Sequence, residues 1–173
     1  MTLLEVNFQY IEIAVMVIYF AIMGFVLVEF RGMKELIKER LDLNNEGLKL
    51  RMQALERLTL FSERAGLKNM IGRVESMQMS AASLHASLIN TIKSEYEYNV
   101  SQQIYVSPEV WNAVTRLKDQ NIYIINQLAA TLPHEAIAMD LGKRILEYSM
   151  ANNAELNMIV LDALQYEAKR VLA

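Results

Sequence analysis

The chain contains no cysteine, and this absence excludes several kinds of protein. Without thiols there is no disulfide framework, no cysteine nucleophile and no cysteine-ligated zinc site. Proline and glycine are also scarce, with two and six residues among 173. Strand-rich folds usually need more turn residues than this, so the composition predicts an all-α protein.

Catalytic and nucleotide-binding motifs are missing as well. The two histidines, His85 and His134, belong neither to an H-E-x-x-H motif nor to a Glu-x-x-His pair, which are the ligand patterns of zinc proteases and di-iron bundles. His85 falls on the apolar side of an expected helix and is interpreted as a hydrogen-bonded core residue. The glycines lie too far apart for a phosphate-binding loop. We therefore expect no enzyme activity, no cofactor and no metal site.

Charge of one sign does not dominate either. The 17 basic and 20 acidic residues are interspersed, and the formal net charge is −3. Proteins that bind nucleic acids usually present a basic face, so nucleic acid is not expected among the partners.

A long apolar run is the most prominent feature that the sequence does have. Residues 13–28, IAVMVIYFAIMGFVLV, include no charged side chain. A helix of this length reaches about 24 Å, and extending it from Phe8 to Phe30 gives roughly 34 Å, enough for the ~30 Å core of a bilayer. Glu12 and Glu29 would then lie near the interfaces, where carboxylates cost less than at the midplane. Residues 1–32 are therefore predicted to form a transmembrane anchor.

Two alternatives for this run stay open at the level of sequence. A cleaved signal peptide usually carries basic residues before the run and an A-x-A site after it, and neither is found here. A buried helix of a soluble bundle is usually apolar on one stripe, whereas this run is apolar all round. The membrane anchor is the favoured interpretation.

The charges that flank the run predict its orientation. No Lys or Arg precedes it, and four follow it within ten residues: Arg31, Lys34, Lys38 and Arg40. Positive residues stay on the cytoplasmic side of a membrane. We expect the N-terminus outside and the following domain in the cytoplasm, attached to the cytoplasmic (inner) membrane.

The next stretch, residues 33–47, is expected to continue the membrane helix into water and to end in a linker. Asp42, Asn44, Asn45 and Gly47 favour turns, and they predict a break in the helix. The rival architecture is a long parallel coiled coil, since leucines recur at a seven-residue spacing, but the same turn residues weaken that heptad pattern.

Residues 48–173 are predicted to form a helical cytoplasmic domain, a bundle of about five helices. The first helix should end before Gly66, and a poorly defined segment should follow from Leu67 to Met79. Ser80 and Ser107 are expected N-terminal caps, the second one reinforced by Pro108. After Pro133, two more helices are expected on either side of Asn152-Asn153.

One face of the helix that follows Ser80 combines apolar and polar residues. Leu84, Leu88 and Ile92 form a stripe, and a rotation of 100° per residue brings Asn99 and Gln103 onto the same face. The polar residues on or beside this stripe are Glu95, Tyr96, Asn99, Gln102 and Gln103. Because buried polar groups need hydrogen-bond partners, the patch is either an internal network that fixes helix register or a binding surface. Arg57 or Arg64 could pair with Glu95.

Two segments of the chain resemble a known family. QALERLTLFSERA and SLINTIKSEYEYNVSQQIYVSPEVW are similar to the ERL-x-LF-x-ER and E-[FY]-E-x-N-x-x-QQ-[IL]-YVS patterns of uncharacterised single-pass membrane proteins from Bacteroidota. The resemblance covers residues 53–111, about a third of the chain, and it departs from the pattern at Ser62, where an apolar residue is expected. It implies an N-terminal membrane helix and a helical domain, but no activity, ligand or partner.

These observations leave two classes of function. The first is a membrane-anchored interaction or scaffold protein, which binds copies of itself as a homo-oligomer or joins a larger envelope complex. The alternative is an accessory regulatory module that binds a small ligand or a partner through the polar face around residues 95–103.

Overall fold

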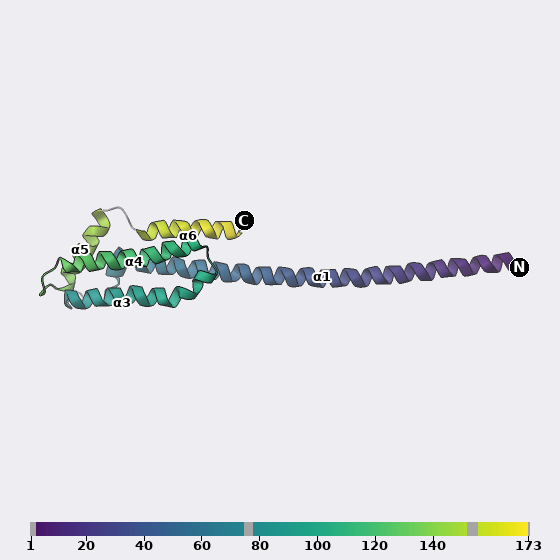
Figure 1. The fold of residues 1–173 in the computed structure, drawn as a ribbon, viewed down its shortest axis with the longest axis horizontal. Helices are drawn as coiled ribbons and strands as arrows, with labels where there is room; N and C mark the ends of the chain where they lie inside the picture. Colours follow the sequence, from purple (N-terminus) through teal and green to yellow (C-terminus); the bar gives the residue numbers. More distant parts are fainter. Residues whose placement is uncertain (1–2, 75–77, 152–155, 173) are drawn as a thin grey trace. The chain divides into compact units, whose positions relative to one another are not determined.

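The computed structural model describes the backbone of residues 3–74, 78–151 and 156–172, and side chains from Glu12 onward. Within these ranges the protein has six α-helices, one 3-10 helix and no β-strand (Figure 1). An isolated antiparallel bridge joins Ser80 to Ile137. The chain divides into two compact units, Met1–Gly47 and Leu48–Ala173.

Helix α1 runs from Leu3 to Ala65 without interruption. The predicted break at Asp42–Gly47 is therefore wrong, since the helix continues through these residues up to the boundary between the two units. Asp and Asn cost only some tenths of a kcal/mol in a helix interior and Gly about 1 kcal/mol. An established helix gains one backbone hydrogen bond for each residue it adds, so a few weak helix formers do not end it.

In the first unit, every described side chain from Glu12 to Gly47 is exposed. An 18-residue window of this segment has a mean hydropathy of 2.5, and none of it is buried. By length and composition α1 is the one helix of the described chain that could cross a membrane, which makes it a candidate span. A signal sequence would pass the same test, whereas a helix of a protein core would be buried.

The second unit contains the remaining elements. They are α2 (Leu67–Gly72), α3 (Ala81–Asn99), η1 (Val100–Ile104), α4 (Pro108–Ala130), α5 (Ala138–Ala151) and α6 (Leu156–Leu172). Both predicted caps are confirmed, since the side chains of Ser80 and Ser107 accept hydrogen bonds from the backbone N–H groups of Ser83 and Val110. The segment expected to be irregular contains α2. The predicted interruption at Asn152-Asn153 lies outside the described residues.

The core of the second unit has two parts, and α4 contributes to both. The first part includes Leu84, Leu88, Ile92, Ile125, Leu141 and Ile145, from α3, α4 and α5. The second part includes Leu55, Leu58, Phe61, Val114, Leu117 and Leu164, from α1, α4 and α6. The final turns of α1 are thus a core element of the helical bundle.

Candidate functional site

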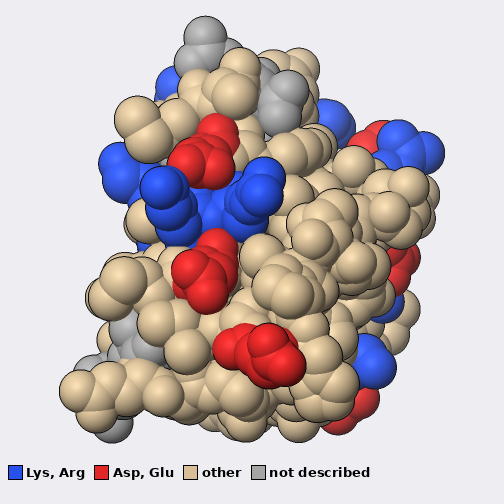
Figure 2. Space-filling view, turned by 90° about the vertical axis from the view of Figure 1, so that its left-hand side faces the viewer, with Lys and Arg blue, Asp and Glu red and all other residues tan. Residues whose placement is uncertain are grey.

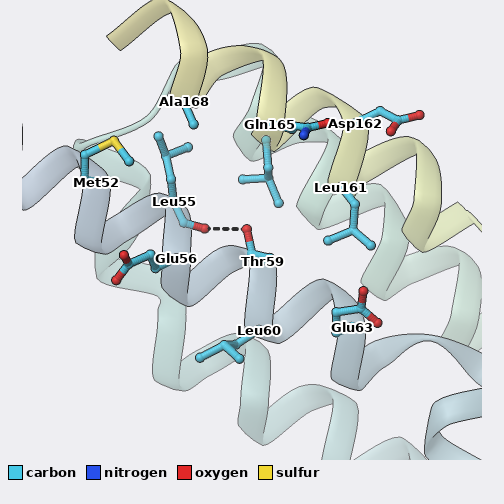
Figure 3. Close-up of a pocket in the computed structure, with 11 residues that line it drawn as sticks. Met52, Leu55, Glu56, Thr59, Leu60, Glu63, Leu161, Asp162, Gln165 and Ala168 are labelled. Atoms are coloured by element: carbon cyan, nitrogen blue, oxygen red, sulfur yellow. Dashed lines mark hydrogen bonds between the residues drawn. The ribbon is translucent and has the colours of Figure 1, made fainter. Parts of the chain in front are cut away.

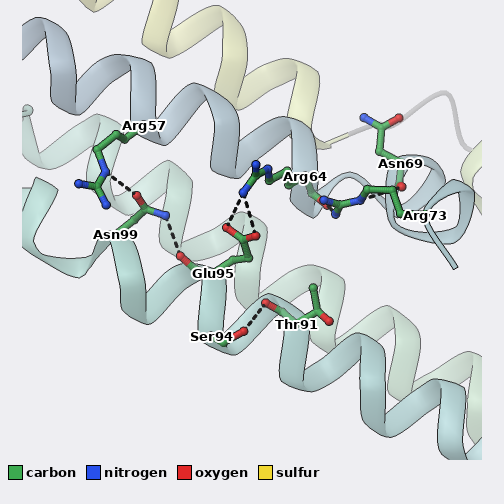
Figure 4. A network of polar contacts seen from close by, with 8 residues as sticks. All are labelled: Arg57, Arg64, Asn69, Arg73, Thr91, Ser94, Glu95 and Asn99. Carbon is green, nitrogen blue, oxygen red and sulfur yellow. Dashed lines mark hydrogen bonds and ion pairs between the residues drawn. The ribbon is translucent and has the colours of Figure 1, made fainter. Parts of the chain in front are cut away.

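The predicted polar patch lies along the contact between α1 and α3 (Figure 4). Arg57 Nε donates to Asn99 Oδ1 at 3.3 Å, and Asn99 Nδ2 donates to the backbone oxygen of Glu95 at 2.8 Å. About two turns farther along α1, Arg64 Nη1 lies 3.1 Å from Glu95 Oε1. Asn99 is buried, and both its amide oxygen and its amide nitrogen have a protein partner. Of the two arginines, Arg64 is therefore the one that pairs with Glu95, and Arg57 pairs with Asn99.

Tyr96 lies in an aromatic cluster rather than in the polar network. Its ring packs edge-on against Phe61 of α1, with centroids 6.1 Å apart, and stacks on Trp111 of α4 at 5.3 Å. Its hydroxyl is 3.0 Å from Thr115 Oγ1, and the ammonium of Lys118 lies 4.4 Å from its ring centroid. Tyr96 thus ties α1, α3 and α4 together at one point.

The placement of Gln103 on the buried face is wrong. Gln102 is buried and Gln103 is exposed, because the helix tightens into η1 after Asn99. A 3-10 helix turns about 120° per residue, so residues three apart eclipse one another. This winding puts Gln102 on the face of Asn99 and turns Gln103 about 120° away. The Gln102 side chain donates to Ser101 Oγ at 3.2 Å.

The two segments that carry the family resemblance pack against each other. Glu56–Arg64 supplies Arg57, Phe61 and Arg64, whose partners Asn99, Tyr96 and Glu95 come from the second segment. Ser62, where an apolar residue is expected, is fully buried, and its hydroxyl donates to the backbone oxygen of Leu58 at 2.9 Å. The hydroxyl is satisfied within its own helix, so the core accepts it without a polar partner elsewhere.

Two buried polar contacts were not predicted from sequence. The carboxylate of Glu167, in α6, accepts hydrogen bonds from the backbone N–H of Ser107 at 2.8 Å and from its hydroxyl. Asn121, in α4, donates to the backbone oxygen of Ala65 at 2.7 Å and so caps the last turn of α1. Both pairs are more than fifty residues apart in sequence, and no short-range pattern could have indicated them.

The two histidines differ in exposure and in contacts. His85 is half-buried, and its Nε2 lies 2.7 Å from Asn126 Oδ1, whereas His134 is exposed. Among the described residues, no group of three or more His, Asp or Glu side chains is arranged to hold a metal ion.

A groove of about 660 Å³ lies between α1 and α6 in the second unit (Figure 3). Leu161 points from α6 toward α1. The lining of the groove combines apolar residues with three carboxylates and contains no Lys or Arg. The apolar lining is Met52, Leu55, Leu60, Leu161, Leu164 and Ala168, and the carboxylates are Glu56, Glu63 and Asp162. The groove is therefore apolar with an acidic margin.

Charges elsewhere are mixed. Figure 2 shows a face of the molecule on which Lys and Arg side chains lie directly beside Asp and Glu side chains. The four basic residues that follow the apolar run, Arg31, Lys34, Lys38 and Arg40, are all exposed.

One known protein family matches nearly the whole chain. A family described as "Family of unknown function (DUF7935)" matches residues 2–171. The chain belongs to this family. The match spans both units, so α1 and the helical bundle are parts of one family architecture. No curated protein and no solved structure matches the chain.

Proposed function

We propose that this DUF7935 member is a membrane-anchored interaction protein, a scaffold that holds a protein partner at the cytoplasmic membrane. The proposal rests on the two different parts of helix α1. Its N-terminal part is apolar all round with none of the 18-residue window buried, and its C-terminal part is core to the helical bundle. A helix of this kind joins a membrane anchor directly to a folded domain.

The proposed orientation is N-terminus outside and bundle in the cytoplasm. It is supported by the exposed basic residues Arg31, Lys34, Lys38 and Arg40, which follow the apolar run, while no basic residue precedes it. Alkaline phosphatase, which is active only outside the cytoplasm, is fused to the C-terminus. We expect little activity in intact cells, and strong activity would overturn the orientation. The matched control replaces the four basic residues by Gln and adds Lys residues before Glu12, which should raise the activity.

The scaffold role has its own test. The tagged full chain is purified from its native membrane in parallel with a variant that lacks residues 1–47. A partner, either further copies in a homo-oligomer or another protein of the envelope, should co-purify in stoichiometric amount with the full chain. In cells that contain only the shortened variant, the partner should be found in the cytosol. Recovery of the full chain alone, as a monomer, would contradict the scaffold role.

The alternative function, ligand binding through the polar face around residues 95–103, has weaker support. Glu95 and Asn99 are occupied by Arg64 and Arg57, and the Tyr96 hydroxyl is occupied by Thr115. A ligand would have to displace these contacts. The same geometry favours an internal network that aligns α3 with α1.

A further inference from the structure

We propose that the groove between α1 and α6 is the docking site for an amphipathic helix of another protein, with a leucine-rich face and flanking Lys or Arg residues. This inference rests on the proposed scaffold role and names the chemistry of the partner. It concerns Met52–Glu63 of α1 and residues 161–168 of α6 only.

Exposed and half-buried apolar side chains line both sides of the groove. Leu60 is 57% exposed, whereas Phe61 beside it and Leu58, two residues before it, are fully buried. Leu161 and Ala168 are half-buried on the facing side of α6. Exposed apolar surface with a polar margin usually marks an interaction site. A third helix laid along α1 and α6 would cover these side chains, since amphipathic helices bind such grooves through residues at i, i+3, i+4 and i+7.

The groove is long enough for a short helix. The α1 side of the groove runs from Met52 to Glu63, roughly three helical turns or ~17 Å. A peptide helix of that length presents about three apolar anchors on one face, which suits a groove of about 660 Å³.

The acidic residues of the groove select a basic occupant. Glu56 and Glu63 lie seven residues apart on α1, about two turns, and Asp162 lies on the opposite side. Glu56 and Asp162 form no ion pair with any residue in the described parts of the chain. Glu63 is already held by Asn69 at 3.1 Å. Basic residues seven apart on one flank of the partner would meet the α1 carboxylates.

The same charges argue against a second copy of this chain in the groove. Two copies that present this face to each other would bring Glu56 and Asp162 toward the same carboxylates. Opposed like charges reduce affinity and suppress wrong partners. Any self-association should therefore use another surface.

The test uses the full chain in nanodiscs of phosphatidylcholine, which carry no net charge. The probes are two fluorescent helical peptides of about 18 residues with the same leucine face, one flanked by Lys and the other by Glu. We expect the Lys peptide to bind at least about tenfold more tightly than the Glu peptide. A higher salt concentration should weaken the binding of the Lys peptide. A photoreactive group on the Lys peptide should label residues 52–63 and 161–168, and empty nanodiscs measure binding to lipid alone.

Two variants probe the groove itself. Glu56→Gln with Asp162→Asn removes negative charge from the groove. Leu60→Asn replaces an exposed apolar side chain of the groove and leaves the buried core unchanged. Each variant should bind the Lys peptide at least about fivefold more weakly than the wild type does. The matched control, Glu97→Gln with Glu135→Gln, removes two exposed charges outside the groove and should leave binding unchanged.

Equal affinity for both peptides, equal affinity of groove and control variants, or self-association abolished by Leu60→Asn would each overturn the inference. The scaffold role is judged separately by the native co-purification. If a stoichiometric partner is retained equally by the wild type and by the groove variants, the groove is not its docking site, but the scaffold role still holds.

Discussion

Val28 and Leu58 belong to one helix, yet Val28 is 68% exposed and Leu58 is fully buried. In residues 13–28, the uncharged run that ends at Val28, the helix is apolar on every side, and no described residue of its unit covers it. Around Leu58 the apolar residues form a stripe covered by α4 and α6, while Glu56 and Glu63 remain exposed. The angular distribution of apolar residues, rather than the continuity of the helix, therefore decides which surroundings each segment needs.

The largest effect should come from removing the all-round apolar segment. A fragment that begins at Leu48 should leave the membrane pellet completely and remain strongly helical by circular dichroism, because it lacks the uncharged apolar run and keeps both parts of the bundle core. Sedimentation after carbonate washing measures the first property. A fragment that still sediments with membranes, or one with a substantial β signal, would contradict the contrast between the two segments.

Within the striped segment, the buried and exposed leucines should differ sharply. Leu58→Ala removes a fully buried side chain from the core, and such changes cost roughly 2–5 kcal/mol. Urea unfolding of the same fragment measures the change in stability. Leu60→Ala, two residues away and exposed, is the control and should change stability by no more than about 0.5 kcal/mol. Similar losses for both would show that the groove face is packed in solution.

Glu167→Ala tests a contact that holds α6 to the start of α4. The carboxylate accepts two hydrogen bonds from Ser107 at a helix N-terminus, where negative charge is favourable. Hydrogen bonds to charged groups contribute roughly 1.5–3 kcal/mol, so thermal unfolding should show a loss of that order. Asp162→Asn, on the exposed side of α6, provides the comparison, and an equal shift in both variants would refute a special role for Glu167.

The smallest expected effect concerns the polar contact between α1 and α3. Asn99→Leu removes both amide hydrogen bonds and leaves the Arg57 guanidinium without its acceptor. A cost of roughly 1–3 kcal/mol is expected. Lys93→Gln, on the exposed side of α3, should stay within about 0.5 kcal/mol. If unfolding temperatures of the two variants coincide, Asn99 does not fix the helix register.

Local signals account for most helix ends that were predicted correctly. Ser80, and Ser107 with Pro108, start helices through contacts within three residues, and Gly66 follows the last residue of α1 as expected. The two failures came from the cooperativity of a helix and from a local change in its winding. The turn residues between Asp42 and Gly47 do not break α1, because helix continuation outweighs their modest cost. The turn to 3-10 winding after Asn99 exchanged Gln102 for Gln103 on the buried face.

The sequence by itself determined the helical class, the apolar segment before Phe30, the basic residues after it and the two serine caps, because each depends on neighbours within a few turns. Only the tertiary structure decided that Arg57 holds Asn99, that Glu167 reaches Ser107, and that Glu56, Leu60 and Asp162 share one groove. These groups lie on helices that meet only after the chain has folded. Their pairing depends on how α1, α3, α4 and α6 pack, and periodicity along one helix carries no information about that packing.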